Sequence, residues 1–140
     1  MIQDKPRQKI FSILGEGGCY FLSIVHLAEH VTSKYIDAFA VFLLAMGNGM
    51  VKDDCFVADP GAVLSFLTQE VWSASKEAAG YQCKPGELEV LRYEWQEVST
   101  LHGHFVAGNG WGAVEYDPYG TSLTVANGKM VSKRIFRRTG

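Results

Sequence analysis

The sequence has no long uninterrupted hydrophobic run, and no apolar stretch lies near its start. Its first ten residues, MIQDKPRQKI, are charged and include a proline, which excludes the hydrophobic core of a secretory signal peptide. The most hydrophobic run covers residues 35–46 and contains Asp37, so it is too short to cross a bilayer and predicts a buried helix. We therefore expect a cytoplasmic protein without membrane insertion.

Positive and negative charges are nearly balanced, and the formal net charge of −2 gives no reason to expect a nucleic-acid partner. The basic residues are nevertheless concentrated near the C-terminus, at Lys129, Lys133, Arg134, Arg137 and Arg138. In an alternating strand, such a cluster predicts a solvated edge of a sheet that resists unwanted pairing.

Cysteine is scarce: Cys19, Cys55 and Cys83 form an odd set without a C-x-x-C pair. With no export signal, this pattern predicts reduced thiols and not a disulfide framework. Cys55 and Cys83 have no base at a fixed spacing, so we expect them to be packing or surface thiols.

The first half of the chain has helical periodicity. At 140 residues, the chain is long enough for a single domain, residues 1–140, with a proper core. Residues 19–31 are apolar on most sides, which is typical of a helix at the centre of a domain. Asp59-Pro60 is a helix start, with a capping residue before a proline at the first helical position. The other expected helices begin near Asp4, cover residues 33–46 and, with weaker periodicity, cover residues 71–80.

After residue 80 the period changes to two, which predicts strands. Asn127-Gly128 has the composition of a tight hairpin turn, and residues 108–112, GNGWG, resemble a second hairpin loop. Helices followed by an antiparallel sheet indicate an α+β fold. The expected strands cover residues 88–95, 104–107, 113–116, 122–126 and 130–137.

Cys19 follows Gly17 and Gly18 at the start of the central helix. A thiol attacks as the thiolate, and the unpaired N–H groups and dipole of a helix N-terminus stabilise that charge. The two glycines would let a substrate backbone come close. Cys19 is therefore a candidate nucleophile.

A thiolate also needs a proton carrier, usually a histidine held by a third polar group. His104 begins one expected strand and Asp117 ends the next. If these strands pair across GNGWG, residues whose numbers sum to about 220 or 221 face each other, which places His104 opposite Tyr116 or Asp117. Taken singly, a buried cysteine, a surface histidine and a turn aspartate explain the three residues as well.

The stretch GGCYFLSIV on a helix, followed by GHFVAGNGWGAVEYDPYG across two strands, resembles the papain-like cysteine peptidase superfamily. The chain is most similar to short bacterial and phage-encoded members near the double-glycine leader peptidases and, more distantly, the NlpC-type cell-wall peptidases. CFVADPGAVLSFL resembles the middle of such domains, so the likeness covers most of the chain. It implies a papain-like α+β fold, with the nucleophile helix packed on a C-terminal antiparallel sheet of about five strands.

The resemblance also implies hydrolysis of a peptide or amide bond, with Cys19 as nucleophile, His104 as base and Asp117 as orienting acid. The substrate would be a leader peptide, a cell-wall peptide or another protein, and no cofactor is implied. Superfamily members carry an oxyanion-binding glutamine about six residues before the cysteine, where this chain has Ile13. Gln8 is the candidate replacement. Without such a donor, the alternative is a weak or inactive papain-like module used for binding.

Residues 26–30, HLAEH, indicate a different chemistry, because they have the H-x-x-E-H form of some zinc peptidases. His26 and His30 share a helix face and can bind zinc with Glu29 as base, which gives a zinc hydrolase as a third alternative. Such a site needs a third protein ligand, and the sequence offers no recognisable one. The same residues are the polar stripe of an otherwise apolar helix, so we expect them to form its exposed face and to bind no metal.

Two further residues are expected beside the thiol site. His102 shares a strand face with His104 and is predicted to flank the site. Trp111 lies in the glycine-rich loop and is predicted to line a substrate cleft.

Overall fold

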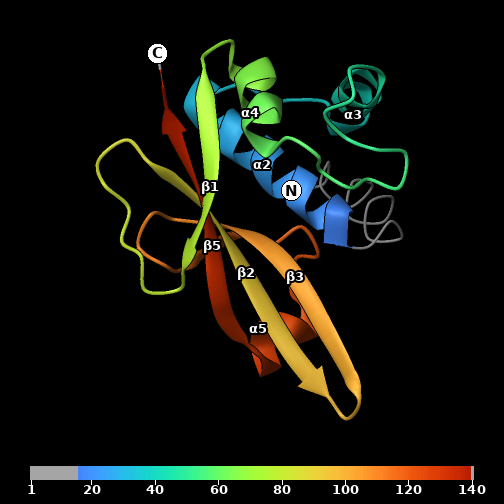
Figure 1. Cartoon of the computed structure of the whole chain (residues 1–140), viewed down its shortest axis with the longest axis vertical. Coiled ribbons are helices and arrows are strands. Elements are labelled where there is room, and N and C mark those ends of the chain that lie inside the picture. The colour runs from blue at the N-terminus through green and yellow to red at the C-terminus, as the bar shows by residue number, and fades with distance from the viewer. Residues whose placement is uncertain (1–15, 140) are drawn as a thin grey trace.

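The computed structural model describes residues 16–139 (Figure 1). The expected helix that begins near Asp4 lies outside these residues. Within them the chain forms an α+β fold with four helices and five strands. The helices are α2 (Glu16–Thr32), α3 (Ala38–Gly47), α4 (Pro60–Thr68) and α5 (Leu123–Asn127). The strands are β1 (Trp72–Ala78), β2 (Leu88–Glu97), β3 (Thr100–Gly108), β4 (Val114–Tyr116) and β5 (Lys129–Arg138).

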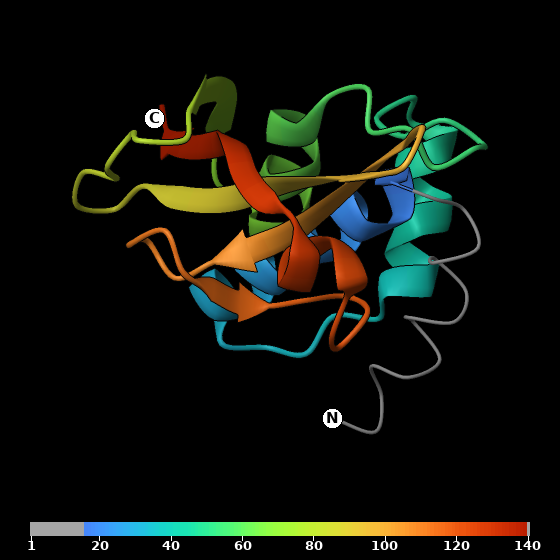
Figure 2. The same ribbon diagram turned by 90° about the horizontal axis from the view of Figure 1, so that it is seen from below.

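The five strands form one antiparallel sheet in the order β1-β5-β2-β3-β4. The prediction of an α+β chain with a C-terminal antiparallel sheet is therefore confirmed. In Figure 1, α2, α3 and α4 gather at one end of the molecule, and the β2–β3 hairpin extends away from them. Figures 1 and 2 both show that α3 lies on the side of α2 that faces away from β1.

The core is built around α2, which contacts both α4 and β3. The helix is apolar on nearly every side, so it can be covered on several faces at once. Its side chains at most 1% exposed include Phe21, Leu22, Ile24, Val25 and Ala28. The start of α4 also follows local sequence, because Asp59 caps Ala62 N–H at 3.0 Å and Pro60 occupies the first turn.

The predicted helix over residues 71–80 is wrong, because this segment forms β1. All seven residues of β1 pair with β5, from Trp72 opposite Arg138 to Ala78 opposite Ser132. Helix propensity is a weak term that an available strand partner overrides. The helix expected over residues 33–46 begins later, at Ala38, because Asp37 accepts hydrogen bonds from the N–H groups of Phe39 and Ala40.

The strand expected over residues 122–126 is also wrong, because this segment forms the short helix α5. The Ser122 hydroxyl caps it by accepting the Val125 N–H at 3.3 Å. Asn127-Gly128 is consequently a helix end and not a hairpin turn. Gly128 is needed because a Cβ there would collide with the carbonyl oxygen of Glu94.

The basic C-terminal strand is not an edge of the sheet, contrary to prediction. β5 lies between β1 and β2, and the Lys133 side chain is buried. In the described part of the chain, no helix is both long enough and apolar enough to span a membrane.

Candidate functional site

Cys19 lies in the first turn of α2 and touches the backbone of β3. The Phe105 N–H donates a hydrogen bond to Cys19 Sγ over 3.3 Å. β4 pairs with β3 only at Ala107 and Gly108, so Phe105 lies beyond the paired part of this sheet edge. The thiol therefore sits at the sheet edge, beside the residue that follows His104.

His104 is fixed on one side of its ring by the turn after β4. Its Nε2 lies 2.7 Å from Asp117 Oδ1, and the ring stacks on Tyr119 with centroids 4.3 Å apart. The Tyr119 N–H donates to the same Oδ1 at 2.9 Å. A neutral imidazole that donates from Nε2 presents the lone pair of Nδ1 on its other side. Asp117 and Tyr119 thus set both the orientation and the tautomer of His104.

The Nδ1 atom of His104 is buried and has no hydrogen-bond partner among the described residues. Leaving a buried polar atom unsatisfied costs about 1–3 kcal/mol. In unliganded sites, catalytic hydrogen bonds are often formed only when substrate is bound. The atom that would exchange a proton with a thiol or leaving group is thus held without a competing partner.

Asp117 is ionised at neutral pH. Burial alone would raise its pKa, but the hydrogen bond and charge of His104 and the bonds from Tyr119 and Ser122 outweigh this and lower the pKa. A carboxylate with a lowered pKa keeps its charge beside the imidazole and stabilises the protonated ring.

The predicted contact between Asp117 and His104 is present, although the predicted strand register is wrong. Tyr116 pairs with Ala107, and the register shifts at a bulge between Ala107 and Gly108. Asp117 reaches His104 because the chain turns back after β4, with the Gly120 N–H bonded to the Asp117 carbonyl at 2.8 Å.

Gly17 has a packing reason to be glycine. A Cβ at this position would collide with the carbonyl oxygen of Cys55, whose backbone adopts a positive φ of 68°. The loop that carries Cys55 is thereby packed directly against the helix turn that carries Cys19. Gly17 also lines the groove described below.

We expect Gly17→Ala to lower the free energy of unfolding by about 1–3 kcal/mol, the usual cost of forcing extra volume into a packed site. Urea titration followed by tryptophan fluorescence measures the change. Gly47→Ala is the matched control, because its added Cβ would meet nothing within 4 Å. Equal stability of Gly17→Ala and the unaltered chain would contradict the close approach to Cys55.

The other two cysteines are poor nucleophiles. Burial, with smaller contributions from Cys19 and Asp54, raises the pKa of Cys55 to about 12. Burial and the nearby Glu89 carboxylate raise the pKa of Cys83 to about 11. Cys55 is fully buried, as expected for a packing thiol, and Cys83 bonds Glu89 Oε1 at 3.6 Å.

A groove of about 750 Å³ lies beside Cys19, between the helices and the sheet. Gly17 and Tyr20, on either side of Cys19 in the sequence, line it together with Phe105. Arg92 and Arg134 contribute positive charge to its walls. No sequence pattern indicates this groove, because its lining comes from segments that only the fold brings together.

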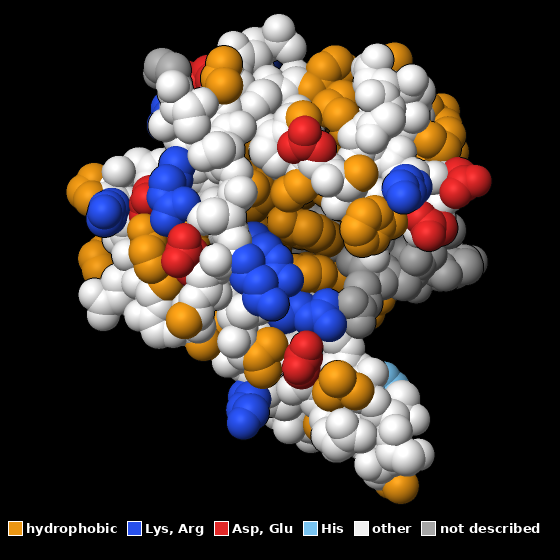
Figure 3. All heavy atoms as spheres, viewed as in Figure 1, with side chains coloured by type: hydrophobic (Ala, Val, Ile, Leu, Met, Phe, Trp, Pro, Cys, Tyr) orange, Lys and Arg blue, Asp and Glu red, His pale blue; other side chains and the backbone are white. Residues whose placement is uncertain are grey.

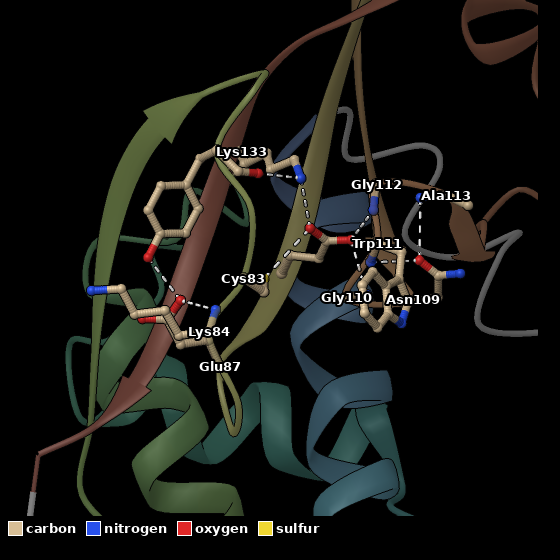
Figure 4. A network of polar contacts seen from close by, with 11 residues as sticks. Cys83, Lys84, Glu87, Asn109, Gly110, Trp111, Gly112, Ala113 and Lys133 are labelled. Carbon is tan, nitrogen blue, oxygen red and sulfur yellow. Dashed lines mark hydrogen bonds and ion pairs between the residues drawn. The ribbon is translucent and has the colours of Figure 1, made fainter.

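The buried ion pair between Glu89 and Lys133 was also not anticipated. Glu89 Oε1 accepts from Lys133 Nζ at 3.0 Å, and Oε2 accepts from the N–H groups of Gly110 and Gly112 at 2.9 and 2.8 Å (Figure 4). Lys133 Nζ also donates to the Tyr81 carbonyl at 2.7 Å. The pair ties β2 and β5 to the loop between β3 and β4, the two strands that carry His104 and lead to Asp117. The available signal was a charged residue within each of two apolar strand patterns.

The remaining predicted site residues lie elsewhere or outside the description. His102 Nε2 lies 2.9 Å from Glu97 Oε1, and its ring stacks on Trp95. Trp111 is 91% exposed on the loop bound by Glu89 and does not line the groove. Their roles beside a substrate, and that of Gly18, stay predictions. Gln8 and Ile13 fall outside residues 16–139, so the oxyanion prediction is untested.

The HLAEH segment has structural partners. His26 Nε2 lies 2.7 Å from Glu115 Oε2, and the ring stacks on Tyr116. Glu29 accepts the Ile36 N–H at 2.8 Å, and His30 is exposed. Among the side chains that the structure describes, no three His, Cys, Asp or Glu residues are placed to hold a metal ion. The zinc alternative gains no support from this geometry.

A family model with the description "Protein of unknown function, DUF261" matches residues 2–138, nearly the whole chain. No protein of curated function and no solved structure matches the chain.

Proposed function

The chain therefore belongs to the DUF261 family, and we propose that it is a papain-like cysteine hydrolase that cleaves a peptide or amide bond. Cys19 is the nucleophile, His104 carries the proton and Asp117 holds the ring. One observation carries the proposal. The His104 ring is bonded to Asp117 at Nε2 and has no hydrogen-bond partner at Nδ1 among the described residues. Phe105, which follows His104, donates its N–H to Cys19 Sγ.

The reaction follows from these roles. The Cys19 thiolate attacks the carbonyl carbon, and His104 donates a proton from Nδ1 to the departing amine as the C–N bond breaks. Water then attacks the resulting thioester while His104 accepts a proton from it, which releases the carboxylic acid and restores the thiol. Asp117 stabilises the imidazolium, which exists while His104 carries the thiol proton to the amine and again after His104 has accepted the proton of water.

The charge on the carbonyl oxygen needs donors as well. Cys19 lies in the first turn of α2, near the positive end of the helix dipole. This dipole can stabilise an oxyanion at this position. Gln8 is proposed as the hydrogen-bond donor.

A non-catalytic binding module is the second candidate. The observation that favours it is burial, because Cys19 and His104 are each only 1% exposed. A hydrolase of this geometry must admit its substrate by moving a neighbouring segment, whereas a binding module can keep the thiol covered. The reactivity of Cys19 decides between the two.

We expect Cys19 to react with iodoacetamide at pH 6.5 up to about 100-fold faster than an exposed cysteine in a model peptide, because an ordinary thiol is only about 1% ionised there. Peptide mapping by mass spectrometry measures the rate at each cysteine of the same chain. His104→Ala should remove the advantage of Cys19. His102→Ala is the matched control on the same strand and should leave it unchanged.

The result is decisive in both directions. A Cys19 that reacts no faster than the model peptide, or equally fast without His104, would rule out the proposed thiol mechanism and leave the binding module. Cys55 and Cys83, whose pKa values are raised, should label more slowly than the model peptide.

A further inference from the structure

The helix α3 carries no polar side chain on either of its faces. Its sequence, AFAVFLLAMG, is apolar apart from the final glycine. One face is covered, because Ala38, Phe42 and Ala45 are buried and the Phe42 ring meets the Phe21 ring edge-on with centroids 5.5 Å apart. A surface helix of a monomeric protein normally carries polar residues on its other face, whereas a helix that is apolar all round is buried. The composition of α3 therefore indicates a helix that is covered on both faces.

The second face of α3 is nevertheless exposed. Phe39, Leu43 and Leu44 share this face at helical spacing, and their exposed fractions are 51%, 49% and 56%. Ala40 is exposed beside them. Figure 3 shows hydrophobic side chains on the surface at the end of the molecule where Figure 1 places α3. Single exposed apolar residues are ordinary, but a contiguous apolar patch marks an interaction site.

A lipid bilayer is a poor occupant of this face. The ten residues of α3 make a helix about 15 Å long, about half the thickness of the hydrocarbon layer, so α3 could only lie along a membrane surface. Helices that bind membrane surfaces in this way are rich in cationic residues. In the segments that flank α3, exposed acidic residues outnumber the basic ones: Asp37, Asp53 and Asp54 against Lys34 and Lys52. The mixed charges favour a protein surface.

The charges at the two ends of α3 are complementary to each other. Lys34 and Asp37 precede the helix, whereas Lys52, Asp53 and Asp54 follow it. If two copies of α3 pack antiparallel, the segment before one helix lies beside the segment after the other. Lys34 of one copy then comes near Asp53 and Asp54 of the other, and Asp37 comes near Lys52. Parallel packing would bring each charge near its own copy, so the charges favour a second copy of this chain in the antiparallel orientation.

We propose that the exposed face of α3 is the interface of a homodimer with two-fold symmetry. An antiparallel helix pair is self-complementary, as a closed two-fold interface requires. With the two-fold axis at the middle of the exposed face, Leu43 of one copy packs beside Leu44 of the other. An interface centred on three large side chains is at the small end of the range for specific complexes, about 1,200 Å², so the dimer should dissociate on dilution. The inference does not use the thiol site.

The test is sedimentation velocity of the full chain in reducing buffer, from about 1 μM to about 200 μM. We expect the sedimentation coefficient to rise with concentration as monomers pair. Leu43→Glu with Leu44→Glu should abolish the rise, because pairing would bury carboxylates without partners. Leu123→Glu is the matched control, since Leu123 is 68% exposed on α5, and should leave the rise unchanged. Cys19→Ser should also leave it unchanged.

An exchange of charges tests the orientation of the two helices. Lys34→Glu should weaken the dimer about tenfold, because the new carboxylate meets Asp53 of the other copy. Asp53→Lys alone should weaken it in the same way, since the new lysine meets Lys34. The two replacements in one chain should restore most of the affinity, because opposite charges face each other again. Both residues are exposed, so these variants should fold even if the paired leucine variant does not.

A chain that stays monomeric at every concentration overturns the proposal, and so does a dimer that survives the paired leucine replacement in a folded chain. A combined charge exchange that restores nothing also overturns it, because the helices would not be antiparallel. If the monomeric chain instead cosediments with vesicles of phosphatidylcholine and phosphatidylglycerol, the face binds lipid and the proposal fails. A dimer with an unactivated Cys19 would reject the hydrolase but keep the interface, and an activated Cys19 in a monomer would do the reverse.

Discussion

Replacing Glu89 by alanine is expected to lower the free energy of unfolding by about 3–5 kcal/mol, the largest effect on stability that we anticipate. Glu89 is fully buried, and Lys133 is nearly so. Without the carboxylate, the Lys133 charge stays in the interior, and the N–H groups of Gly110 and Gly112 lose their acceptor. A typical domain is stable by only about 5–15 kcal/mol, so the loss is a large fraction of the whole.

Glutamine at the same position separates the charge from the hydrogen bonds. Its single oxygen can face either Lys133 or the two loop N–H groups, and its NH₂ then meets donors on the other side. We expect Glu89→Gln to cost about 1–3 kcal/mol. Adding Lys133→Met should recover part of this, because the amide oxygen can then turn to Gly110 and Gly112.

Urea titrations of these variants, followed by tryptophan fluorescence, measure the differences. Glu97→Gln is the matched control, since Glu97 is an exposed partner of His102 and such pairs contribute at most about 1 kcal/mol. A Glu89→Ala variant as stable as the Glu97→Gln control would contradict the account of the buried pair. Glu89 also holds the loop between β3 and β4, so its replacement should change the emission of Trp111 on that loop.

Elements with strong local signals could be predicted from the sequence. The apolar run of α2 and the cap-proline pair Asp59-Pro60 both specify helices through neighbouring residues alone, and both are present. Residues 71–80 lack such a signal, and in residues 122–126 the alternating pattern indicated a strand although Ser122 is a helix-capping residue. The first segment became a strand because β5 offered a partner along its whole length, and the second became a helix because Ser122 capped it.

The same distinction explains what could be predicted of the site. Cys19, His104 and Asp117 are residue types with a known chemistry, and two of them flank one hairpin, so their proximity could be expected. The places of Arg92 and Arg134 in the groove lining could not be predicted. β5 was predicted at a solvated edge, whereas its position between β1 and β2 buries Lys133 and turns Arg134 into the groove. Strand order depends on segments that are distant in the sequence, so no local sequence pattern indicates it.

The second large effect is expected at Asp117, which acts through His104 and not on the substrate. Asp117→Ala should slow iodoacetamide labelling of Cys19 at pH 6.5 about 100-fold, as His104→Ala does, because a positioned base contributes about 10²–10⁴-fold. Without the acceptor at Nε2, neither the tautomer nor the ring orientation of His104 is fixed.

Asp117→Asn is the informative comparison. The His104 Nε2–H and the Tyr119 N–H both point at Oδ1, so an amide should place its oxygen there and keep the tautomer while losing the charge. We expect an intermediate rate, about tenfold below the unaltered chain. A purely structural role for Asp117 would instead slow labelling in proportion to lost stability, with no recovery by asparagine.

The pH dependence of stability provides an independent readout. The folded-state pKa of Asp117 lies below its ordinary value of 3.8, so its ionised form stabilises the fold above that pH. This contribution is lost as the pH falls below 3.8 toward the folded-state pKa. In urea titrations from pH 7 to about pH 2, the unaltered chain should therefore lose its greater free energy of unfolding relative to Asp117→Asn as the pH falls below 3.8. If the free energy of unfolding of the two chains depends on pH in the same way, Asp117 carries no charge that stabilises the folded protein. The proposed role of Asp117 in holding His104 would then lose its support.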